Sequence, residues 1–143
     1  MIDLHCHILP FVDDGAENAS VACAMAEHAL RCGVDTVVAT PHCNLHGARG
    51  NYRGDEYSRS LAMFRALLRQ HHIPLRVLPG AENFCHRNGF AGLLREKRFL
   101  TLNGSRYFLA EFNFFLERRD HHGASADDCR ARLCAADCPS GAL

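Results

Sequence analysis

Two histidines near the start of the chain, His5 and His7, have the spacing of residues that could bind one metal ion. Residues two apart on a strand point to the same face, so both imidazoles could reach one cation while Cys6 points away. The chain contains 10 histidines, and one such pair is therefore weak evidence when taken alone. By itself, the pair is more simply interpreted as two exposed histidines at a strand end.

Further candidate ligands recur at comparable places along the chain. A histidine or a carboxylate follows or ends each of four predicted strands: Asp13 and Asp14, then His42, then Glu82, then Glu111. In parallel α/β folds, binding and catalytic groups gather at the C-terminal ends of the strands. Charged side chains beside apolar strands are also costly to bury without a partner or a metal. The joint pattern predicts a metal site; the simpler alternatives are a structural ion pair for Glu111 and a solvated loop for Glu82.

The elements that must position these residues follow from the hydrophobic periodicity. Strands are predicted over 2–7, 34–40, 74–78 and 107–112, and helices over 18–32, 55–70 and 90–97, with a loop over 43–54. The first helix has apolar rows that begin at Val21 and at Ala22, and the second has one row of Tyr57, Leu61, Phe64 and Leu68. The alternation of strands and helices indicates an α/β fold with a parallel sheet.

Composition narrows the class of protein. The chain has 143 residues, a formal net charge of zero and 48% hydrophobic residues, which is typical of one soluble globular domain or a part of one. Without an excess of basic residues, nucleic acid is not expected as a partner. No apolar run approaches the ~20 residues of a membrane span, and the N-terminus does not resemble a signal peptide. The eight cysteines form no CxxC pair, so we expect reduced thiols and a cytoplasmic protein.

Several motifs, in the same order, resemble those of the PHP (polymerase and histidinol phosphatase) superfamily. They are HCH at 5–7 followed by DDG at 13–15, ATPH at 39–42, PGAE at 79–82 and LTLNGSRYFLAEF at 100–112. More narrowly, the chain resembles the bacterial capsular-polysaccharide branch, the manganese-dependent protein-tyrosine phosphatases of the CpsB/YwqE type, over about residues 1–115. The resemblance implies the N-terminal part of a distorted (β/α)7, TIM-like barrel that holds three metal ions. It also implies removal of phosphate from the tyrosine-rich tail of a bacterial tyrosine kinase that controls exopolysaccharide synthesis.

The resemblance also implies metal ligands. His5, His7 and Glu82 would bind a first metal, and Glu82 would bridge to a second metal that also uses Glu111. The implied catalytic residues are His5, His7 and Glu82, which act through a bridging hydroxide that attacks phosphorus. Oxygen and imidazole ligands suit Mn²⁺, with Fe, Zn or Mg as alternatives.

The third metal would be bound by Asp13 and His42, whereas Asp14 either binds metal or orients the turn. The loop over 46–53 contains arginines and a tyrosine that could meet a phosphate or a phenol ring. A solvated surface loop is the equally plausible interpretation of this segment.

The length of the chain leads to further expectations. A closed barrel needs roughly 250 residues, and the family's later AHPER-like and Asp-x-His motifs are absent from the 143 residues. We expect residues 1–120 to be the N-terminal portion of the phosphatase domain and 121–143 to be a divergent tail without a strand, disordered or frameshifted in origin. Four strands would leave an open edge that favours pairing with a second copy of the chain.

Two alternatives to the tyrosine phosphatase remain. One is another PHP phosphoesterase, such as a histidinol-phosphatase type that acts on a small metabolite. The other is a non-catalytic fragment or binding module that holds the kinase or a metal. Amidohydrolases also begin with an HxH motif on a barrel strand, but the DDG and ATPH segments fit them less well.

Overall fold

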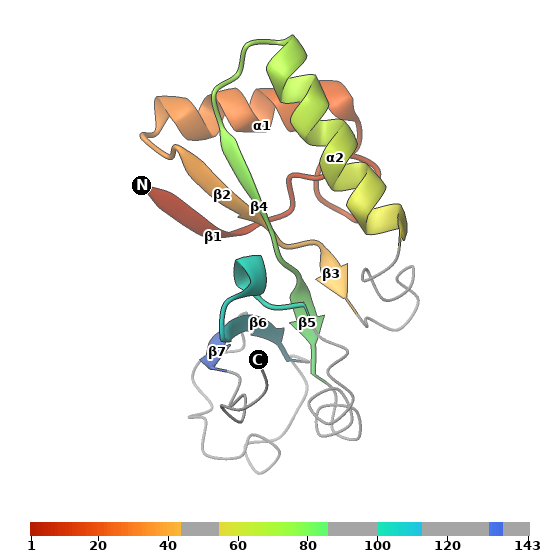
Figure 1. The fold of residues 1–143 in the computed structure, drawn as a ribbon, viewed down its shortest axis with the longest axis vertical. Coiled ribbons are helices and arrows are strands. Elements are labelled where there is room, and N and C mark those ends of the chain that lie inside the picture. Colours follow the sequence, from red (N-terminus) through yellow and green to blue (C-terminus); the bar gives the residue numbers. More distant parts are fainter. Residues whose placement is uncertain (44–54, 86–99, 113–131, 136–143) are drawn as a thin grey trace, which may run out of the picture.

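The computed structural model describes residues 1–43, 55–85, 100–112 and 132–135. Its elements, in chain order, are β1 (Ile2–Cys6), α1 (Ala19–Arg31), β2 (Thr36–Ala39), β3 (His42–Cys43), α2 (Asp55–Gln70), β4 (Arg76–Pro79), β5 (Glu82–Phe84), the short 3-10 helix η1 (Leu102–Gly104), β6 (Tyr107–Glu111) and β7 (Arg132–Ala135). The architecture is mixed α/β, with both α-helices beside the strands of the upper part in Figure 1. The predicted helix over 90–97 and most of the predicted loop over 43–54 lie outside the described residues.

The strands form two sheets, ordered β1-β2-β4 and β3-β5-β6-β7. The two sheets have the same offset between paired residues. Thr36 lies opposite Arg76 in the β2–β4 pair, and His42 lies opposite Glu82 in the β3–β5 pair. The β2–β3 line is interrupted at Pro41, which has no N–H to donate to a ladder. Across this interruption the Glu82 N–H donates to the Pro41 carbonyl at 3.0 Å. Two chain segments thus continue from the first sheet into the second. The short strands β3 and β5 lie beyond the predicted strands over 34–40 and 74–78, and the sequence pattern does not predict them.

β7 is the main departure from the sequence-based expectation. It pairs antiparallel with β6, with Tyr107 opposite Ala135, whereas every other strand pair is parallel. The apolar residues of the segment 121–143 are few and irregular, so its sequence pattern predicts no strand. An open strand edge offers unpaired backbone donors and acceptors, so pairing there does not require an apolar pattern. Within the described residues the sheets do not close into a barrel.

Helix α1 begins at a cap and packs through small residues. The side chain of Asn18 accepts a hydrogen bond from the Val21 N–H at 3.0 Å, which satisfies one of the open donors of the first turn. Of the two apolar rows in the sequence, the structure buries the one with Ala22 and Ala26, whereas Val21 is 37% exposed. Alanines allow the helix to approach the sheet closely, and Gly33 at a φ of 79° ends it.

Helix α2 buries the apolar row predicted from its sequence. Tyr57, Leu61, Phe64 and Leu68 are all buried, and they join the strand residues of the first sheet in the main core. The opposite face mixes polar side chains such as Arg59 with Met63, which is 49% exposed. Neither of the α-helices in the described ranges is long and apolar enough to cross a membrane.

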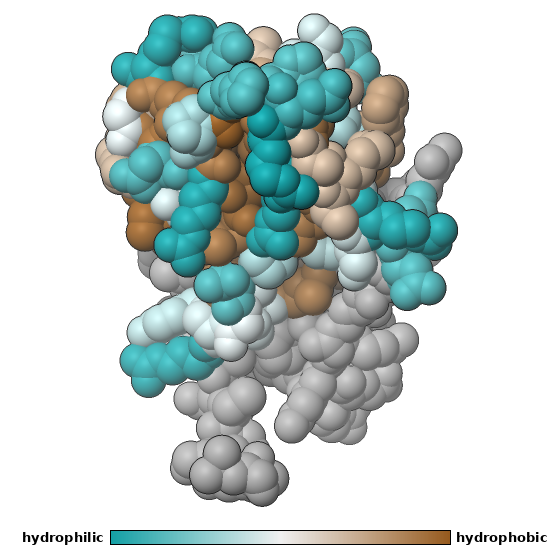
Figure 2. Space-filling model, turned by 45° about the horizontal axis from the view of Figure 1, so that its top comes forward, coloured by the Kyte–Doolittle hydropathy of each residue, from teal (hydrophilic) through white to brown (hydrophobic). Residues whose placement is uncertain are grey.

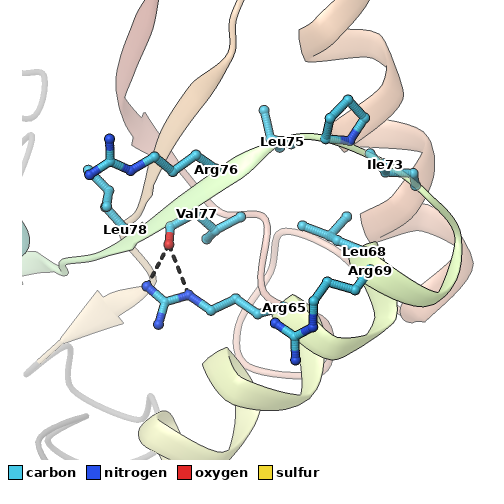
Figure 3. A pocket seen from close by; sticks show the side chains of 9 residues that line it. Arg65, Leu68, Arg69, Ile73, Leu75, Arg76, Val77 and Leu78 are labelled. Carbon is cyan, nitrogen blue, oxygen red and sulfur yellow. Dashed lines mark hydrogen bonds between the residues drawn. The ribbon is translucent and has the colours of Figure 1, made fainter.

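The outer edge of β4 is covered by a side chain of α2. Arg65 donates two hydrogen bonds to the Val77 carbonyl, from Nε at 3.0 Å and from Nη2 at 2.6 Å (Figure 3). This carbonyl would otherwise be an unpaired acceptor at a sheet edge. The same arginine lines a cavity of about 470 Å³ between α2 and β4, together with Arg69 and Arg76.

Strand β1 forms the opposite edge of the first sheet. Its side chains Ile2 and Leu4 are 58% and 44% exposed. Apolar surface also reaches the outside between hydrophilic side chains in the upper part of the molecule (Figure 2). An apolar face on an edge strand is a surface that proteins usually cover with another element or another chain.

Candidate metal centre

The candidate ligands meet at one end of the parallel strands. His5 lies in β1 and His7 follows it directly, while His42 and Glu82 open β3 and β5 opposite each other in the register. Glu111 ends β6 and lies opposite Phe84 of β5. Because parallel strands end on the same side of a sheet, residues that are far apart in the sequence come within contact distance.

A first group of ligand atoms joins His5, His7 and Glu82, all within 4.8 Å of one another. The Oε2 atom of Glu82 lies 3.1 Å from His5 Nε2 and 2.9 Å from His7 Nε2. The Glu82 side chain is 5% exposed and that of His5 is 42% exposed, so the group opens to solvent on the His5 side. Burial and two nearby carboxylates raise the pKa of the intervening Cys6 thiol to about 11, so this residue remains a neutral thiol.

A second group shares Glu82 and adds His42 and Glu111. His42 Nδ1 lies 3.1 Å from Glu111 Oε2 and 3.4 Å from Glu82 Oε2. A third group joins His42 and His7 with Asp14, whose Oδ1 lies 3.4 Å from His42 Nε2. Asp14 has a side chain that is 78% exposed, so this group also faces solvent. The three groups overlap through shared residues and form one continuous cluster.

Asp13 lies between His7 and His42, the two histidines of the third group. Both of its oxygens are engaged: Oδ1 accepts from the Gly15 N–H at 3.1 Å, and Oδ2 accepts from the His42 N–H at 3.0 Å and lies 2.8 Å from His7 Nδ1. The resemblance pairs Asp13 with His42 on one metal. In the structure Asp13 contacts the backbone N–H of His42, and it is Asp14 whose oxygen is grouped with the His42 ring. Neighbouring residues in a turn point in different directions, and the sequence alone could not show which carboxylate faces the cluster.

Charges inside the cluster are mutually stabilised. Burial alone would raise the pKa of Glu82, but hydrogen bonds from His5 and His7 outweigh it and hold that pKa at about 2. Burial alone would lower the pKa of His7, but hydrogen bonds to Asp13 and Glu82 raise it to about 10. Glu82 is thus a carboxylate over the whole range in which the protein would act, as a metal ligand must be.

The donor set fits divalent cations. Its ligand atoms are imidazole nitrogens and carboxylate oxygens, the donors found in Mn, Fe, Zn and Mg sites. Burial and repulsion from Glu82 raise the pKa of Glu111, which marks two carboxylates forced close together in a partly buried place. A positive ion between them would remove that repulsion. The structure therefore provides a physical reason for a metal, besides the ligand types.

Two supporting residues were not found from the sequence. The Thr40 hydroxyl is fully buried and accepts the Cys6 N–H at 3.0 Å, which joins the end of β1 to the end of β2. The buried amide of Asn83 donates to the carbonyls of Ala81, Leu100 and Leu109, which locks β5 against β6 beside Glu82. Their sequence signal is position, since Thr40 lies within the ATPH motif and Asn83 directly follows the PGAE motif. The predicted substrate loop over 46–53 lies outside the described residues.

The chain is similar to known proteins in sequence. A family model described as "Capsular polysaccharide synthesis, CpsB/CapC" matches residues 1–125. The tyrosine-protein phosphatase YwqE of Bacillus subtilis is 39% identical over 114 residues, which are 80% of this chain and 44% of that protein. The tyrosine-protein phosphatase CpsB of Streptococcus pneumoniae is 31% identical over 124 residues, which are 85% of this chain and 49% of that protein.

A solved structure is also similar. It is described as YwqE from Bacillus subtilis and CpsB from Streptococcus pneumoniae, unique metal-dependent tyrosine phosphatases, and it matches with a TM-score of 0.72 and 36% sequence identity. The match covers 82% of this chain and 47% of the other. The chain spans about half the length of the curated relatives it matches.

Proposed function

The chain belongs to the CpsB/CapC family of capsular polysaccharide synthesis, and from this premise we propose that it acts in metal-dependent hydrolysis of phosphotyrosine in proteins. The observation that carries the proposal is the cluster at the strand ends, in which Glu82 and His42 each belong to two groups of potential ligands. Overlapping groups of this kind are suited to cations that lie close together. Phosphomonoester hydrolysis is a reaction for which such paired cations are used.

Each residue of the cluster has a role in this proposal. His5, His7 and Glu82 would hold one cation, and Glu82 and Glu111 a second, while Asp14 and His42 would hold a third. When bound, the cations would activate water and neutralise the phosphoryl oxygens. Water adds to phosphorus as the bond to the tyrosine oxygen breaks, and the phenol and phosphate leave.

The open side of the cluster fits entry of a phosphate. His5 and Asp14 have side chains that are 42% and 78% exposed, whereas Glu82 is almost fully buried beneath them. A phosphate that approaches from solvent would meet the exposed ligands first. The buried carboxylate is then protected from bulk water, which strengthens its interaction with a cation.

We propose Mn²⁺ as the cation, with Fe, Zn and Mg as alternatives. Mixed imidazole and carboxylate donors suit all four metals.

We further propose that the two sheets are the first part of a distorted (β/α)7 barrel of the PHP type. The parallel order from β1 through β2 and β4, and from β3 through β5 to β6, supports this. The proposed substrate is the phosphotyrosine tail of a bacterial tyrosine kinase, supported by relatives named as tyrosine-protein phosphatases within a capsule-synthesis family.

Phosphate release from a phosphotyrosine peptide, measured with purified chain and Mn²⁺, tests the function. We expect turnover that falls at least about 100-fold in His5→Ala and in Glu82→Ala, because each variant loses a ligand of the cluster. Asp35→Asn is the matched control, since this exposed carboxylate pairs with the N-terminus away from the cluster. Histidinol phosphate serves as a competing substrate.

Three outcomes would contradict the proposal. Turnover that survives both substitutions would place the reaction elsewhere. Preference for histidinol phosphate would favour a metabolite phosphatase. Binding of the peptide by folded, metal-bound chain without any turnover would favour a binding module.

A further inference from the structure

His7 lies in two of the three ligand groups and can serve only one of them. Its Nε2 atom is 2.9 Å from Glu82 Oε2 and 3.2 Å from His5 Nε2. Its Nδ1 atom is the nitrogen that lies near Asp14, at 3.6 Å from Oδ1. A neutral imidazole carries a hydrogen on one nitrogen and a lone pair on the other. Something must therefore determine which nitrogen of His7 is left to bind a cation.

Asp13 contacts Nδ1 of His7 and so determines which nitrogen carries the hydrogen. Its side chain is 4% exposed, and its Oδ2 atom lies 2.8 Å from His7 Nδ1. Both oxygens already accept backbone N–H groups, Oδ1 from Gly15 and Oδ2 from His42. An oxygen that accepts from a backbone N–H has no hydrogen to give, so the Nδ1 of His7 must be the donor.

The turn after β1 holds this carboxylate in place. The His7 carbonyl accepts the Ala16 N–H at 3.1 Å, so the chain folds back onto His7. A Cβ atom on Gly15 would lie 2.1 Å from the His7 carbonyl oxygen, which means that only glycine permits this approach. Asp13 is thereby fixed against both His7, directly after β1, and the start of β3.

We propose that Asp13 is a positioning residue, which keeps Nδ1 of His7 protonated and directs Nε2 to a cation shared with His5 and Glu82. The inference rests on the proposed function, because it assumes that this cluster binds metal. It gives Asp13 a role different from that of the adjacent Asp14. It also withdraws His7 from the group with Asp14 and His42, which is left with two protein donors among the described residues. Carboxylate–histidine–metal arrangements of this kind fix the ring and raise its basicity.

The test uses Zn²⁺, whose diamagnetism permits NMR of the histidine rings. Long-range ¹H–¹⁵N spectra of the Zn²⁺-bound chain report which nitrogen of His7 is coordinated, and titration against a chromophoric chelator gives the affinity. In the wild-type chain we expect coordination through Nε2 with Nδ1 protonated. In Asp13→Ala we expect coordination that shifts toward Nδ1 and an affinity lower by roughly 10- to 100-fold.

Asp13→Asn is the second variant, since its amide oxygen can still accept from Nδ1 and the substitution is isosteric. We expect it to keep coordination through Nε2, with a weaker hydrogen bond at Nδ1 and a smaller loss of affinity. Asp35→Asn removes an exposed carboxylate elsewhere and should change neither readout. Wild-type coordination through Nδ1 would overturn the inference. Unchanged coordination and affinity in folded Asp13→Ala, or in Asp13→Asn if the alanine variant does not fold, would also overturn it.

Failure of the proposed function gives a different result. If the wild-type chain binds no Zn²⁺, the proposed metal site is wrong, and the metal-free spectrum then decides the role of Asp13. A protected Nδ1 proton of His7 that is present in the wild type and lost or shifted in both variants supports the inference. Its absence from the wild type contradicts it.

Discussion

Glu82 is the residue on which the cluster depends most. Its Oε2 atom lies within 3.4 Å of nitrogens from His5, His7 and His42, although these residues come from three separate parts of the chain. In the absence of a cation, His7, whose pKa is raised to about 10, provides a positive partner for this buried carboxylate. A cation bound by Glu82 and His7 would replace the proton on His7 Nε2, so protonation of His7 and metal binding compete.

The contacts between Glu82 and His7 predict how the stability of the metal-free chain depends on pH. The pKa of Glu82 is about 2 instead of its ordinary 4.5, so its stabilisation is present above pH 4.5 and is lost as the pH falls through about 2. The pKa of His7 is about 10 instead of 6.5, so its stabilisation is present below pH 6.5 and is lost as the pH rises through about 10. The free energy of unfolding should therefore be greatest between pH 4.5 and pH 6.5.

Urea unfolding in the presence of EDTA measures this dependence. Glu82→Gln removes the carboxylate charge of Glu82 and with it one partner of the protonated His7. Both the acid and the alkaline decline in stability should therefore become shallower. Glu17→Gln removes an exposed carboxylate and should leave the pH profile unchanged. An unaltered profile in the Glu82→Gln variant would show that the ion pairs do not stabilise the fold.

Among the secondary-structure elements, helix α2 is hydrogen-bonded to the two junctions at which the chain passes from one sheet to the other, between β2 and β3 and between β4 and β5. The Tyr57 hydroxyl accepts the Gly80 N–H at 3.0 Å and donates to the Ala39 carbonyl at 3.5 Å. Gly80 is itself crowded, because a Cβ atom there would lie 2.6 Å from Val38 Cγ1. One side chain of α2 thus positions both segments that carry His42 and Glu82 from the first sheet into the second.

Tyr57→Phe should destabilise the protein without altering the apolar packing of the ring. The substitution leaves the buried Gly80 N–H without its acceptor, and such a loss costs about 1–3 kcal/mol. Chemical denaturation would show this as a lower midpoint with an unchanged dependence on denaturant concentration. Ser60→Ala on the same helix is the control, because Ser60 Oγ is buried without a hydrogen-bond partner. We expect that variant to be as stable as the wild type, and equal stability of Tyr57→Phe would contradict the role of the hydroxyl.

At the scale of the whole molecule, the cluster joins strands from both sheets. Its ligands come from β1, β3, β5 and β6 and from the turn after β1, so a bound cation would connect segments of both sheets at a single point. A ligand that binds only the folded state stabilises it in proportion to the logarithm of its concentration. Metal binding and folding should therefore be coupled throughout the structure.

Thermal unfolding with and without Mn²⁺ checks this coupling. When Mn²⁺ is 100 times its Kd, the stabilisation is about 2.7 kcal/mol, which at roughly 4 °C per kcal/mol for a domain of this size raises Tm by about 10 °C. Glu111→Gln removes the ligand from β6, so the increase should shrink markedly. Glu17→Gln, the same chemical change at an exposed site, should keep the full increase. An equal increase in both variants would place the bound cation away from the cluster.

The main elements and most of the cluster could be predicted from the order of residues along the chain. The apolar row of α2 and four of the strands lie where periodicity predicts them. The strand ends carry His5, His7, His42, Glu82 and Glu111, and the structure brings these side chains together. These features depend on local spacing and on the general rule that parallel strands end on one side, both of which can be read from order along the chain.

The remaining features depend on contacts that form in the folded chain. Asp13 and Asp14 are chemically identical neighbours, and their different roles depend on which carboxylate meets the His7 ring and the His42 N–H. The division into two sheets and the pairing of β7 likewise depend on backbone contacts between distant segments. Side-chain direction in a turn is set by backbone dihedral angles and by partners far away in the sequence. The spacing of residue types along the chain specifies neither these dihedral angles nor these distant partners.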